Sequence, residues 1–373
     1  MSDLAMREEA DSKRKYYLDN IRFLTVLLVI VYHVVYVFNS VGVITNIDVP
    51  GIPQMDVLLY FVYPWFMNLL FVVAGMSARY SLEKRNDRTF LKERTKRLLV
   101  PSIAGIFLLG WVSGWVTNQY ADMFAGGGAQ IPGFVKYLIY CLCGIGPLWF
   151  AHELFLASLV LLLLRKLERQ EKIWKLGAKT PVWVLGLLVF AVWGSSKIGN
   201  TPLVEVYRNG IYIFMFLLGY YVFSHEEVLK RLEQYRVVLL AAAIVAGVAY
   251  TVYYYGENYT TSECLQSFFT NAYAWLAILA VLACFHAWGE WKNPFSVYMT
   301  KRSFGFYVLH YPLLIMLAYL ITTYLNLPVL CNYLLLLLLE ILLLPLFYEV
   351  VSRLPVIRYL LLGITGKKRK AEA

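Results

Sequence analysis

The chain has 373 residues, of which 60% are hydrophobic and 16% are charged, and its mean hydropathy is +0.59. Soluble domains are about 45–50% apolar, so this composition excludes an ordinary soluble protein and indicates a polytopic membrane protein. The net charge of +10 does not indicate nucleic-acid binding, because the basic runs border apolar segments, where membrane orientation and anionic lipid account for them.

Apolar windows of about 20 residues predict an all-α polytopic membrane protein with about ten transmembrane helices. The helices are expected near residues 20–41, 56–78, 98–118, 147–165, 181–196, 208–224, 236–255, 268–288, 303–324 and 329–351. No repeat relates the two halves, which is weak evidence against an inverted-repeat transporter.

The distribution of basic residues predicts that both termini are cytoplasmic. Of the 34 Lys and Arg residues, only Lys136, Lys197 and Arg208 fall in the alternate set of loops, and cytoplasmic loops are the ones enriched in positive charge. We therefore expect a cytoplasmic N-terminal segment at 1–17, a single ten-helix domain at 18–352 and a basic cytoplasmic tail at 353–373.

The first apolar run carries two ionisable residues, Arg22 and His33. They are eleven residues apart, which on a helix gives three turns plus roughly 20° and a rise of about 16 Å. Both would face one cavity, with a cation at its mouth and at depth an imidazole able to accept and return a proton. The alternatives are that Arg22 pairs with Asp19 or snorkels, and that His33 only joins helices by a hydrogen bond.

The second cytoplasmic loop contains Arg94 and Arg97, whose spacing suits two guanidinium groups binding phosphates, although inside loops are generally rich in arginine. The run "GPLWFAHELF" places Trp149, His152 and Glu153 in an apolar helix. A zinc-protease reading fails there because the second histidine of that motif is absent.

Two polar sites lie near the C-terminus. Tyr307 and His310 share a helix face before Pro312, which we expect to bend or open the helix; a structural hydrogen bond and catalysis are equally compatible with them. Glu340 lies in a run of leucines, so it should be protonated or paired with an inward His or Arg. The five cysteines have no zinc-site spacing, and we expect packing roles and no metal site.

Taken together, several motifs resemble the integral-membrane acyltransferase family 3, over about residues 16–363. Within it, "PW…LLF…AG" and "YE…R.P…R" are most similar to a branch of membrane glucan-modifying enzymes. The motifs are "YYLDNIRFLTVLLVIVYH", "YPWFMNLLFVVAG", "FLKERTKRLLVP", "GIGPLWFAHELF", "SFGFYVLHYPLL" and "LFYEVVSRLPVIR".

The resemblance implies an O-acyltransferase that moves a short acyl group, of acetyl or succinyl type, from cytoplasmic acyl-CoA to a hydroxyl of an extracytoplasmic glycan or similar acceptor. It implies no tightly bound cofactor, acetyl-CoA as the favoured donor, the bacterial cytoplasmic membrane as location, the lipid bilayer as surroundings and a homodimer as one possible assembly. The positions that match the family's recurrent residues are Arg22, His33, Arg94 and Arg97.

These observations assign roles to the unusual residues. His33, Arg22, Glu340 and His310 are the predicted catalytic residues, and Arg94, Arg97 and Arg22 are predicted to bind the donor phosphates. The predicted cavity-lining residues are Trp149, His152, Glu153 and Tyr307. The competing predictions are a transporter or flippase of a lipid-linked sugar or small anion that uses a His, Glu and Arg relay, and a scaffold whose buried polar groups only hold helices together.

Overall fold

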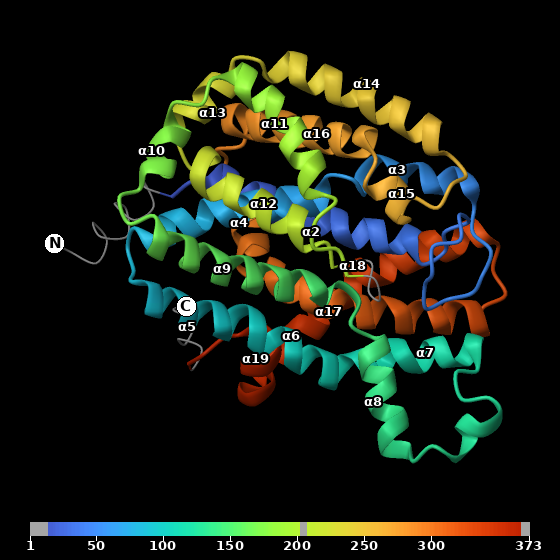
Figure 1. The fold of residues 1–373 in the computed structure, drawn as a ribbon. Coiled ribbons are helices and arrows are strands. Elements are labelled where there is room, and N and C mark those ends of the chain that lie inside the picture. Colours follow the sequence, from blue (N-terminus) through green and yellow to red (C-terminus); the bar gives the residue numbers. More distant parts are fainter. Residues whose placement is uncertain (1–13, 202–206, 367–373) are drawn as a thin grey trace.

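The computed structural model describes residues 14–201 and 207–366, so parts of the predicted N-terminal segment 1–17 and basic tail 353–373 lie outside the described residues. Within these ranges the structure is a bundle of helices without a named strand (Figure 1). This confirms the all-α prediction.

Eight helical spans are long and apolar enough to cross a membrane, by length and composition, in the described ranges. They are α2 (Tyr16–Tyr36), η1–α4 (Pro53–Leu82), α5–α7 (Asp87–Ala121), η5–α9 (Gly146–Leu167), α14 (Arg236–Tyr254), α16 (Phe268–Trp288), α17 (Pro294–Tyr324) and α18 (Val329–Arg353). Two shorter apolar helices, α11 (Val182–Ser195) and α12–η6 (Asn209–Phe223), coincide with the other two predicted windows. The count of ten, the single-domain boundaries and the cytoplasmic side of the termini stay predictions.

Short helices connect the spans, and one of them, α19 (Pro355–Leu362), follows the last span. The others are α8 (Gly133–Cys143), α10 (Lys172–Ala178), α13 (Glu226–Glu233) and α15 (Ser262–Leu265), together with the short η4 turn (Gly126–Gln130). Helix α8 projects from the bundle beside α7 (Figure 1), and its Phe134 and Leu142 are exposed, as expected of a helix at the membrane interface.

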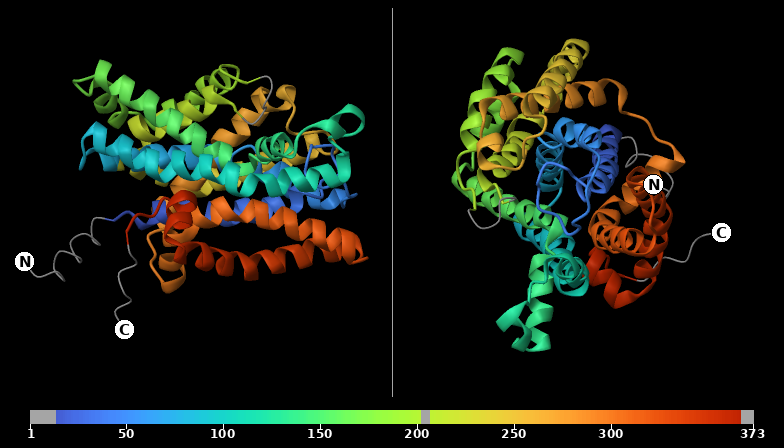
Figure 2. Two further views of the ribbon diagram at one scale, coloured as in Figure 1. Left: turned by 90° about the horizontal axis from the view of Figure 1, so that it is seen from below. Right: turned by 90° about the vertical axis from the view of Figure 1, so that its right-hand side faces the viewer.

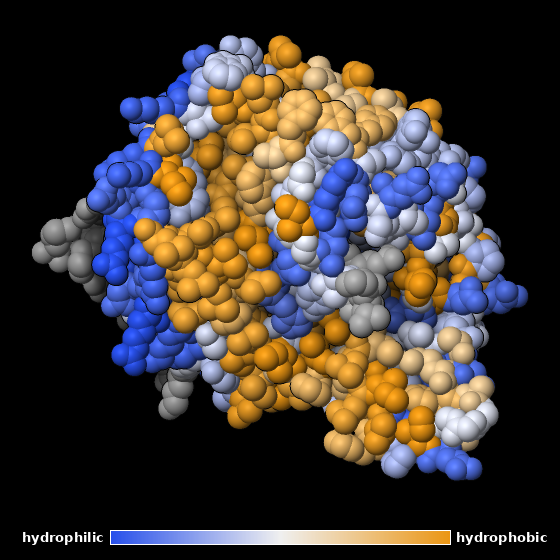
Figure 3. All heavy atoms as spheres, in the orientation of Figure 1, coloured by the Kyte–Doolittle hydropathy of each residue, from blue (hydrophilic) through white to orange (hydrophobic). Residues whose placement is uncertain are grey.

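Helices α2 and α4 lie inside a ring formed by the other helices (Figure 2). In the apolar windows of the spans that contain them, 61% and 67% of residues are buried, whereas α14 and α18 bury only 22% and 28%. The polar residues of the inner helices are thereby kept from lipid. Figure 3 shows an apolar surface between two more hydrophilic ends, the pattern of a protein that spans a bilayer.

Two glycines let inner and outer helices approach closely. A Cβ at Gly75 of α4 would lie 1.9 Å from the Phe216 carbonyl oxygen, and one at Gly219 would lie 2.0 Å from the Val72 carbonyl oxygen. Small residues at such contacts are how membrane helices gain packing area without large side chains. This contact fixes α12–η6 against α4.

Where α2 begins, a polar cluster joins three helices. The His286 ring nitrogens lie 2.9 Å from Glu226 and 2.6 Å from Glu233, and the Lys15 Nζ donates to Glu226 at 2.6 Å. Burial alone would raise the pKa of Glu226, but the hydrogen bonds from Lys15 and His286 outweigh burial and lower it. The cluster therefore ties α13 to α16 and to the residue before α2.

Candidate functional site

Two histidines from helices far apart in sequence meet inside the bundle. The His310 Nε2 of α17 lies 3.3 Å from the His33 Nδ1 of α2, and the two ring centroids are 5.1 Å apart. His310 is fully buried and His33 is half-buried. The sequence predicted each residue as catalytic, and the structure brings them into direct contact.

Backbone carbonyls fix which nitrogens carry protons in the neutral pair. The His310 Nδ1 lies 2.8 Å from the Tyr307 carbonyl oxygen, which can only accept, so this nitrogen donates and the His310 Nε2 is an acceptor. The His33 Nδ1 lies 2.8 Å from the Val29 carbonyl oxygen and faces that His310 acceptor, so it too donates. The His33 Nε2 is therefore the unprotonated nitrogen, the form that a general base requires.

Tyrosines and a polar relay hold the His33 ring. Tyr32, Tyr36 and Tyr311 pack edge-on against it, with centroid distances of 5.2, 5.7 and 5.0 Å. The Tyr311 hydroxyl donates to Asn46 at 2.7 Å. These contacts orient the imidazole from several sides, which favours one fixed geometry at the base.

A small cavity of about 10 Å³, which is space for roughly one water molecule, is lined by Tyr307 and Tyr311, whose rings pack against His310 and His33. Tyr311 forms part of its wall and packs against Gly146, whose φ of +46° and close approach leave no room for a side chain. The Tyr307 hydroxyl donates to the Pro147 carbonyl oxygen. The other lining residues are Gly105, Gly110, Gly144, Ile145, Leu148, Val308 and Pro312.

Pro312 does not interrupt α17, so the expected opening of the helix is wrong, while the expected bend stays a prediction. The helix continues from Pro294 to Tyr324. Proline lacks the N–H that would bond to the carbonyl four residues earlier, and both Pro312 and that residue, Val308, line the small cavity. The missing backbone hydrogen bond of Pro312 therefore lies beside the small cavity.

A cluster of arginines lies at the opposite end of α2 from His33. Arg22 donates to Asp19 at 2.9 Å and to the Ser77 hydroxyl at 2.8 Å, and 37% of its side chain is exposed. The ion pair with Asp19 confirms the structural alternative for one arm of Arg22. Asp19 is shared, because it also pairs with Arg14 at 2.7 Å.

The two loop arginines extend this cluster. Arg94 ends α5 (Asp87–Arg94) with its guanidinium 4.9 Å above the Phe90 ring centroid, and Arg97 lies in the π-helical turn η2 (Thr95–Leu99). Among neighbouring charges, those of Arg22 and Arg97 act most strongly on Arg94. No carboxylate of the described ranges forms an ion pair with Arg94 or Arg97, so the cluster carries excess positive charge.

The structure corrects the prediction for Glu340. Its side chain is fully buried, and neither oxygen has a hydrogen-bond partner among the described residues. A direct pair with His33, His310 or an arginine is therefore wrong for this structure. An ionised carboxylate in that position would be strongly unfavourable, which leaves the protonated alternative.

Trp149, His152 and Glu153 form no hydrogen bond or ring contact with His33 among the described residues, and their place in its cavity stays a prediction. They lie in the first turns of α9 against Tyr207 and Tyr212, at the start of α12. Tyr307 alone of the predicted lining residues borders the small cavity. Periodicity gave their inward direction, but it could not tell which neighbouring helix they would face.

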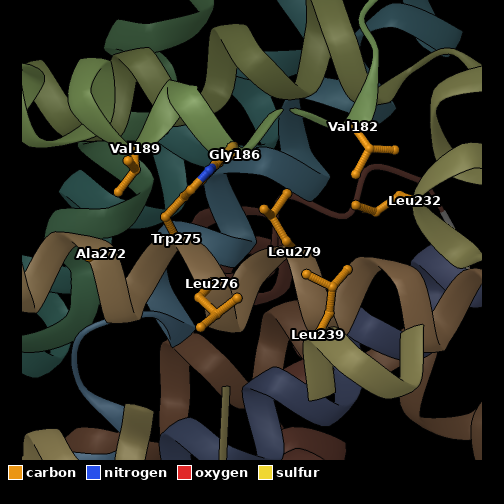
Figure 4. A pocket seen from close by; sticks show the side chains of 9 residues that line it. All are labelled: Val182, Gly186, Val189, Leu232, Leu239, Ala272, Trp275, Leu276 and Leu279. Carbon is orange, nitrogen blue, oxygen red and sulfur yellow. The ribbon is translucent and has the colours of Figure 1, made fainter. Parts of the chain in front are cut away.

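Neither of the two cavities described here includes Arg22 or His33, so the predicted shared cavity is not formed in them. The larger cavity, about 280 Å³, is apolar and open (Figure 4). It lies between α11, α14 and α16, lined by Val182, Gly186, Trp275 and Leu276 among others. It contains no group able to exchange a proton.

Asn46 and Tyr311 were missed by the sequence reasoning. Asn46 lies in a loop, and its amide donates to the Thr117 hydroxyl at 2.7 Å while its oxygen accepts from Tyr311. The only sequence signal was that Tyr311 follows His310 directly. A polar loop residue in a membrane protein gives no sign of pointing into the bundle.

With this geometry established, comparisons place the chain among known proteins. A family model described as an acyltransferase domain matches residues 15–362. The chain belongs to the acyltransferase 3 family. Membership confirms the resemblance drawn from the motifs and supports acyltransferase activity in a multi-pass membrane protein.

Similar proteins in this acyltransferase family share nearly the full length. Glucans biosynthesis protein C of Escherichia coli (strain SMS-3-5 / SECEC) is 24% identical over 391 residues, covering 96% of this chain and 97% of that protein. The protein of the same name from Salmonella typhimurium (strain LT2) is 21% identical over 383 residues, with the same coverage. No solved structure matches the chain.

Proposed function

We propose that this acyltransferase takes a short acyl group from cytoplasmic acyl-CoA and transfers it to a hydroxyl of an extracytoplasmic glycan. The observation that carries the proposal is that one helix, α2, holds both parts of a transferase site. The His33 Nε2 is unprotonated, and the arginine cluster around Arg22 carries excess positive charge. An oriented base and a phosphate-binding cluster are the two parts that this reaction needs.

In the proposed reaction His33 acts directly on the acceptor. Its Nε2 takes the proton of the acceptor hydroxyl while the hydroxyl oxygen forms a bond to the thioester carbonyl carbon. Collapse of the tetrahedral intermediate breaks the carbon–sulfur bond, and the imidazolium returns the proton to the leaving thiolate. The His310 Nε2 and the Val29 carbonyl oxygen both accept from the His33 Nδ1, and so stabilise the imidazolium.

Arg22, Arg94 and Arg97 would bind the phosphates of coenzyme A. Their charge is balanced by one carboxylate, Asp19, which Arg14 also occupies. Guanidinium groups bind phosphate through paired N–H donors. The rise of about 16 Å from Arg22 to His33 is of a length that the flexible arm of coenzyme A can bridge.

The donor is acetyl-CoA or succinyl-CoA, and the acceptor is a glycan or another envelope component. The printed name of the two relatives refers to glucans, which makes a glucose oligosaccharide the first acceptor to test. The bacterial cytoplasmic membrane is the proposed location, because the apolar belt needs a bilayer and the relatives are bacterial.

Consumption of acyl-CoA by the purified protein in lipid nanodiscs tests the proposal. We expect saturable loss of one thioester from a panel that includes acetyl-CoA and succinyl-CoA, and we expect His33→Ala to abolish it at unchanged thermal stability. A protein that binds and consumes no acyl-CoA would contradict the proposal.

A proton-coupled transporter is a second candidate, and one observation favours it. Glu340 is buried without a hydrogen-bond partner among the described residues, and buried carboxyls of this kind often carry protons in transporters. In the transferase, the protonated Glu340 would supply a hydrogen-bond donor near α17. Flux of a labelled sugar or anion across proteoliposomes, without loss of acyl-CoA, would favour the transporter.

A further inference from the structure

A second group of polar side chains lies in the first turns of α9 and α12, at the opposite end of the bundle from the arginines. The His152 Nδ1 lies 2.9 Å from the Tyr207 hydroxyl, with the two rings parallel to within 13°. Beside them Glu153 is only 1% exposed, and its Oε2 has no hydrogen-bond partner among the described residues. A buried acceptor without a partner is costly unless a ligand completes it.

These side chains are close enough to act on one another. Burial raises the pKa of Tyr207, and the charge of Glu153 adds to this rise. Glu153 of α9 is therefore close to Tyr207, the residue two before the start of α12. The Arg208 guanidinium, just before α12, donates to the Leu265 carbonyl oxygen at 3.0 Å.

The group also reaches toward the histidine pair. The Tyr307 carbonyl oxygen accepts from the His310 Nδ1 at 2.8 Å. Phe150, in the first turn of α9, packs its ring against Tyr307 with the two centroids 5.6 Å apart. The side chains of Phe150 and Tyr307 therefore lie between the first turn of α9 and the candidate base.

An aromatic wall stands beside the carboxyl group. Trp149 precedes Glu153 by one helical turn and therefore shares its face of α9. Its ring lies 4.9 Å from that of Tyr212, and Tyr212 stacks at 4.7 Å on Phe71. Sugar rings present C–H groups on their faces and hydroxyls on their edges, so a half-buried tryptophan next to hydrogen-bond acceptors suits them.

The surface at this place is hydrophilic although apolar surfaces surround it. Figure 3 shows a hydrophilic strip where α11 ends and α9 and α12 begin. Lys197 is exposed there, and Asn200 and Asn209 are partly exposed.

We propose that Trp149, Glu153 and the His152–Tyr207 pair form the carbohydrate acceptor site, with the sugar ring against Trp149 and a hydroxyl bound by Glu153. This inference rests on the proposed acyl transfer, since it supplies the acceptor for that reaction. The sequence predicted these residues to line the cavity of His33. Here they bind the acceptor, at the opposite end of the bundle from the arginines that bind the donor.

Equilibrium binding without any donor tests the site independently of the reaction. The probes are tritiated maltopentaose and laminaripentaose, with glycerol as a polyol that lacks a ring. The variants are Glu153→Gln and Trp149→Leu, and the control is Glu263→Gln, which makes the same charge change at an exposed position of the same end. Binding of coenzyme A is measured in parallel for each protein.

We expect saturable binding of at least one pentasaccharide, weakened about tenfold or more in both site variants and unchanged in the control. The dissociation constant for coenzyme A should stay within about twofold in all proteins. Equal pentasaccharide binding by wild type and both variants, no pentasaccharide binding by the wild type, or binding of glycerol as tight as that of the pentasaccharides would overturn the proposal.

Transfer of labelled acetyl from acetyl-CoA to the bound pentasaccharide then separates the two hypotheses. A rise in the acceptor KM of Glu153→Gln, larger than its fall in kcat, supports the acceptor site. If the wild type binds the pentasaccharide but consumes no acyl-CoA, the transferase fails while the carbohydrate site stands. If it consumes acyl-CoA but binds no pentasaccharide, the carbohydrate site fails while the transferase stands.

Discussion

Replacing His310 by leucine should slow acyl transfer about 2- to 13-fold, far less than the replacement of His33 by alanine. His310→Leu removes one acceptor from the His33 Nδ1, at 3.3 Å, but leaves the Val29 carbonyl oxygen at 2.8 Å. One net hydrogen bond is worth about 0.5–1.5 kcal/mol, and 1.36 kcal/mol corresponds to a tenfold change in rate. The remaining carbonyl still selects the productive tautomer of His33.

Loss of the base itself should cost more. A general base contributes about 10²- to 10⁴-fold, so His33→Ala should lower kcat by at least about 100-fold. His310→Gln is the control for packing, because its amide oxygen can accept from the His33 Nδ1, and its rate should lie between those of His310→Leu and wild type.

The assay should follow coenzyme A by chromatography rather than with a thiol reagent. The protein has free cysteines, and Cys143 and Cys331 are exposed and would react with such a reagent. The donor dissociation constant and the melting temperature are measured for every variant. A fall of more than about 100-fold in His310→Leu together with a small effect of His33→Ala would refute this assignment, because His310 would then be the base.

Three further outcomes follow from the geometry. Arg94→Ala and Arg97→Ala should each raise the KM for acyl-CoA about tenfold with a smaller change in kcat, as measured by initial rates, whereas Arg85→Ala should change neither. Gly75→Ala should destabilise the protein by about 1–3 kcal/mol or prevent folding, because its Cβ would overlap a backbone carbonyl at 1.9 Å; an unchanged melting temperature would contradict this packing. Glu226→Gln should lower the melting temperature by about 1–3 °C at pH 7. Folding lowers the pKa of Glu226, so its carboxylate stabilises the fold at pH values above the ordinary pKa of about 4.3. This stabilisation is lost as the pH falls through the lowered pKa of the folded protein. The difference in melting temperature between Glu226→Gln and wild type should therefore vanish in acid.

The membrane helices were predictable because each one appears in the sequence as a long run of apolar residues. The predicted windows near 98–118 and 303–324 start later than the helices, which begin at Asp87 and Pro294. Polar residues extend these two helices beyond the apolar part, and hydropathy does not register them. The π-helical turn at Thr95–Leu99 could not be predicted either, since it depends on the packing around the helix.

The site was only partly predictable. Arg22 and His33 stood out because charge and imidazole are rare in apolar helices, but their partners depend on the order of helices in the bundle. His310 reaches His33 across 277 residues of sequence, and the sequence contains no pattern that specifies that contact. For Glu340 the sequence suggested a partner that the structure does not show. Neither carboxyl oxygen has a hydrogen-bond partner among the described residues.

In the proposed function the donor and the acceptor bind at different ends of the bundle, and this separation would distinguish a transferase from a transporter. A transporter must let its whole substrate pass, whereas a transferase needs only a thioester from one end and a hydroxyl from the other to meet at the His33 Nε2. Between them, Tyr311 packs against Gly146, the Tyr307 hydroxyl bonds to Pro147, and the cavity there measures about 10 Å³. A cavity of that size cannot hold a sugar ring in this conformation, so in the proposed reaction the thioester and one acceptor hydroxyl, rather than a whole sugar, reach the His33 Nε2.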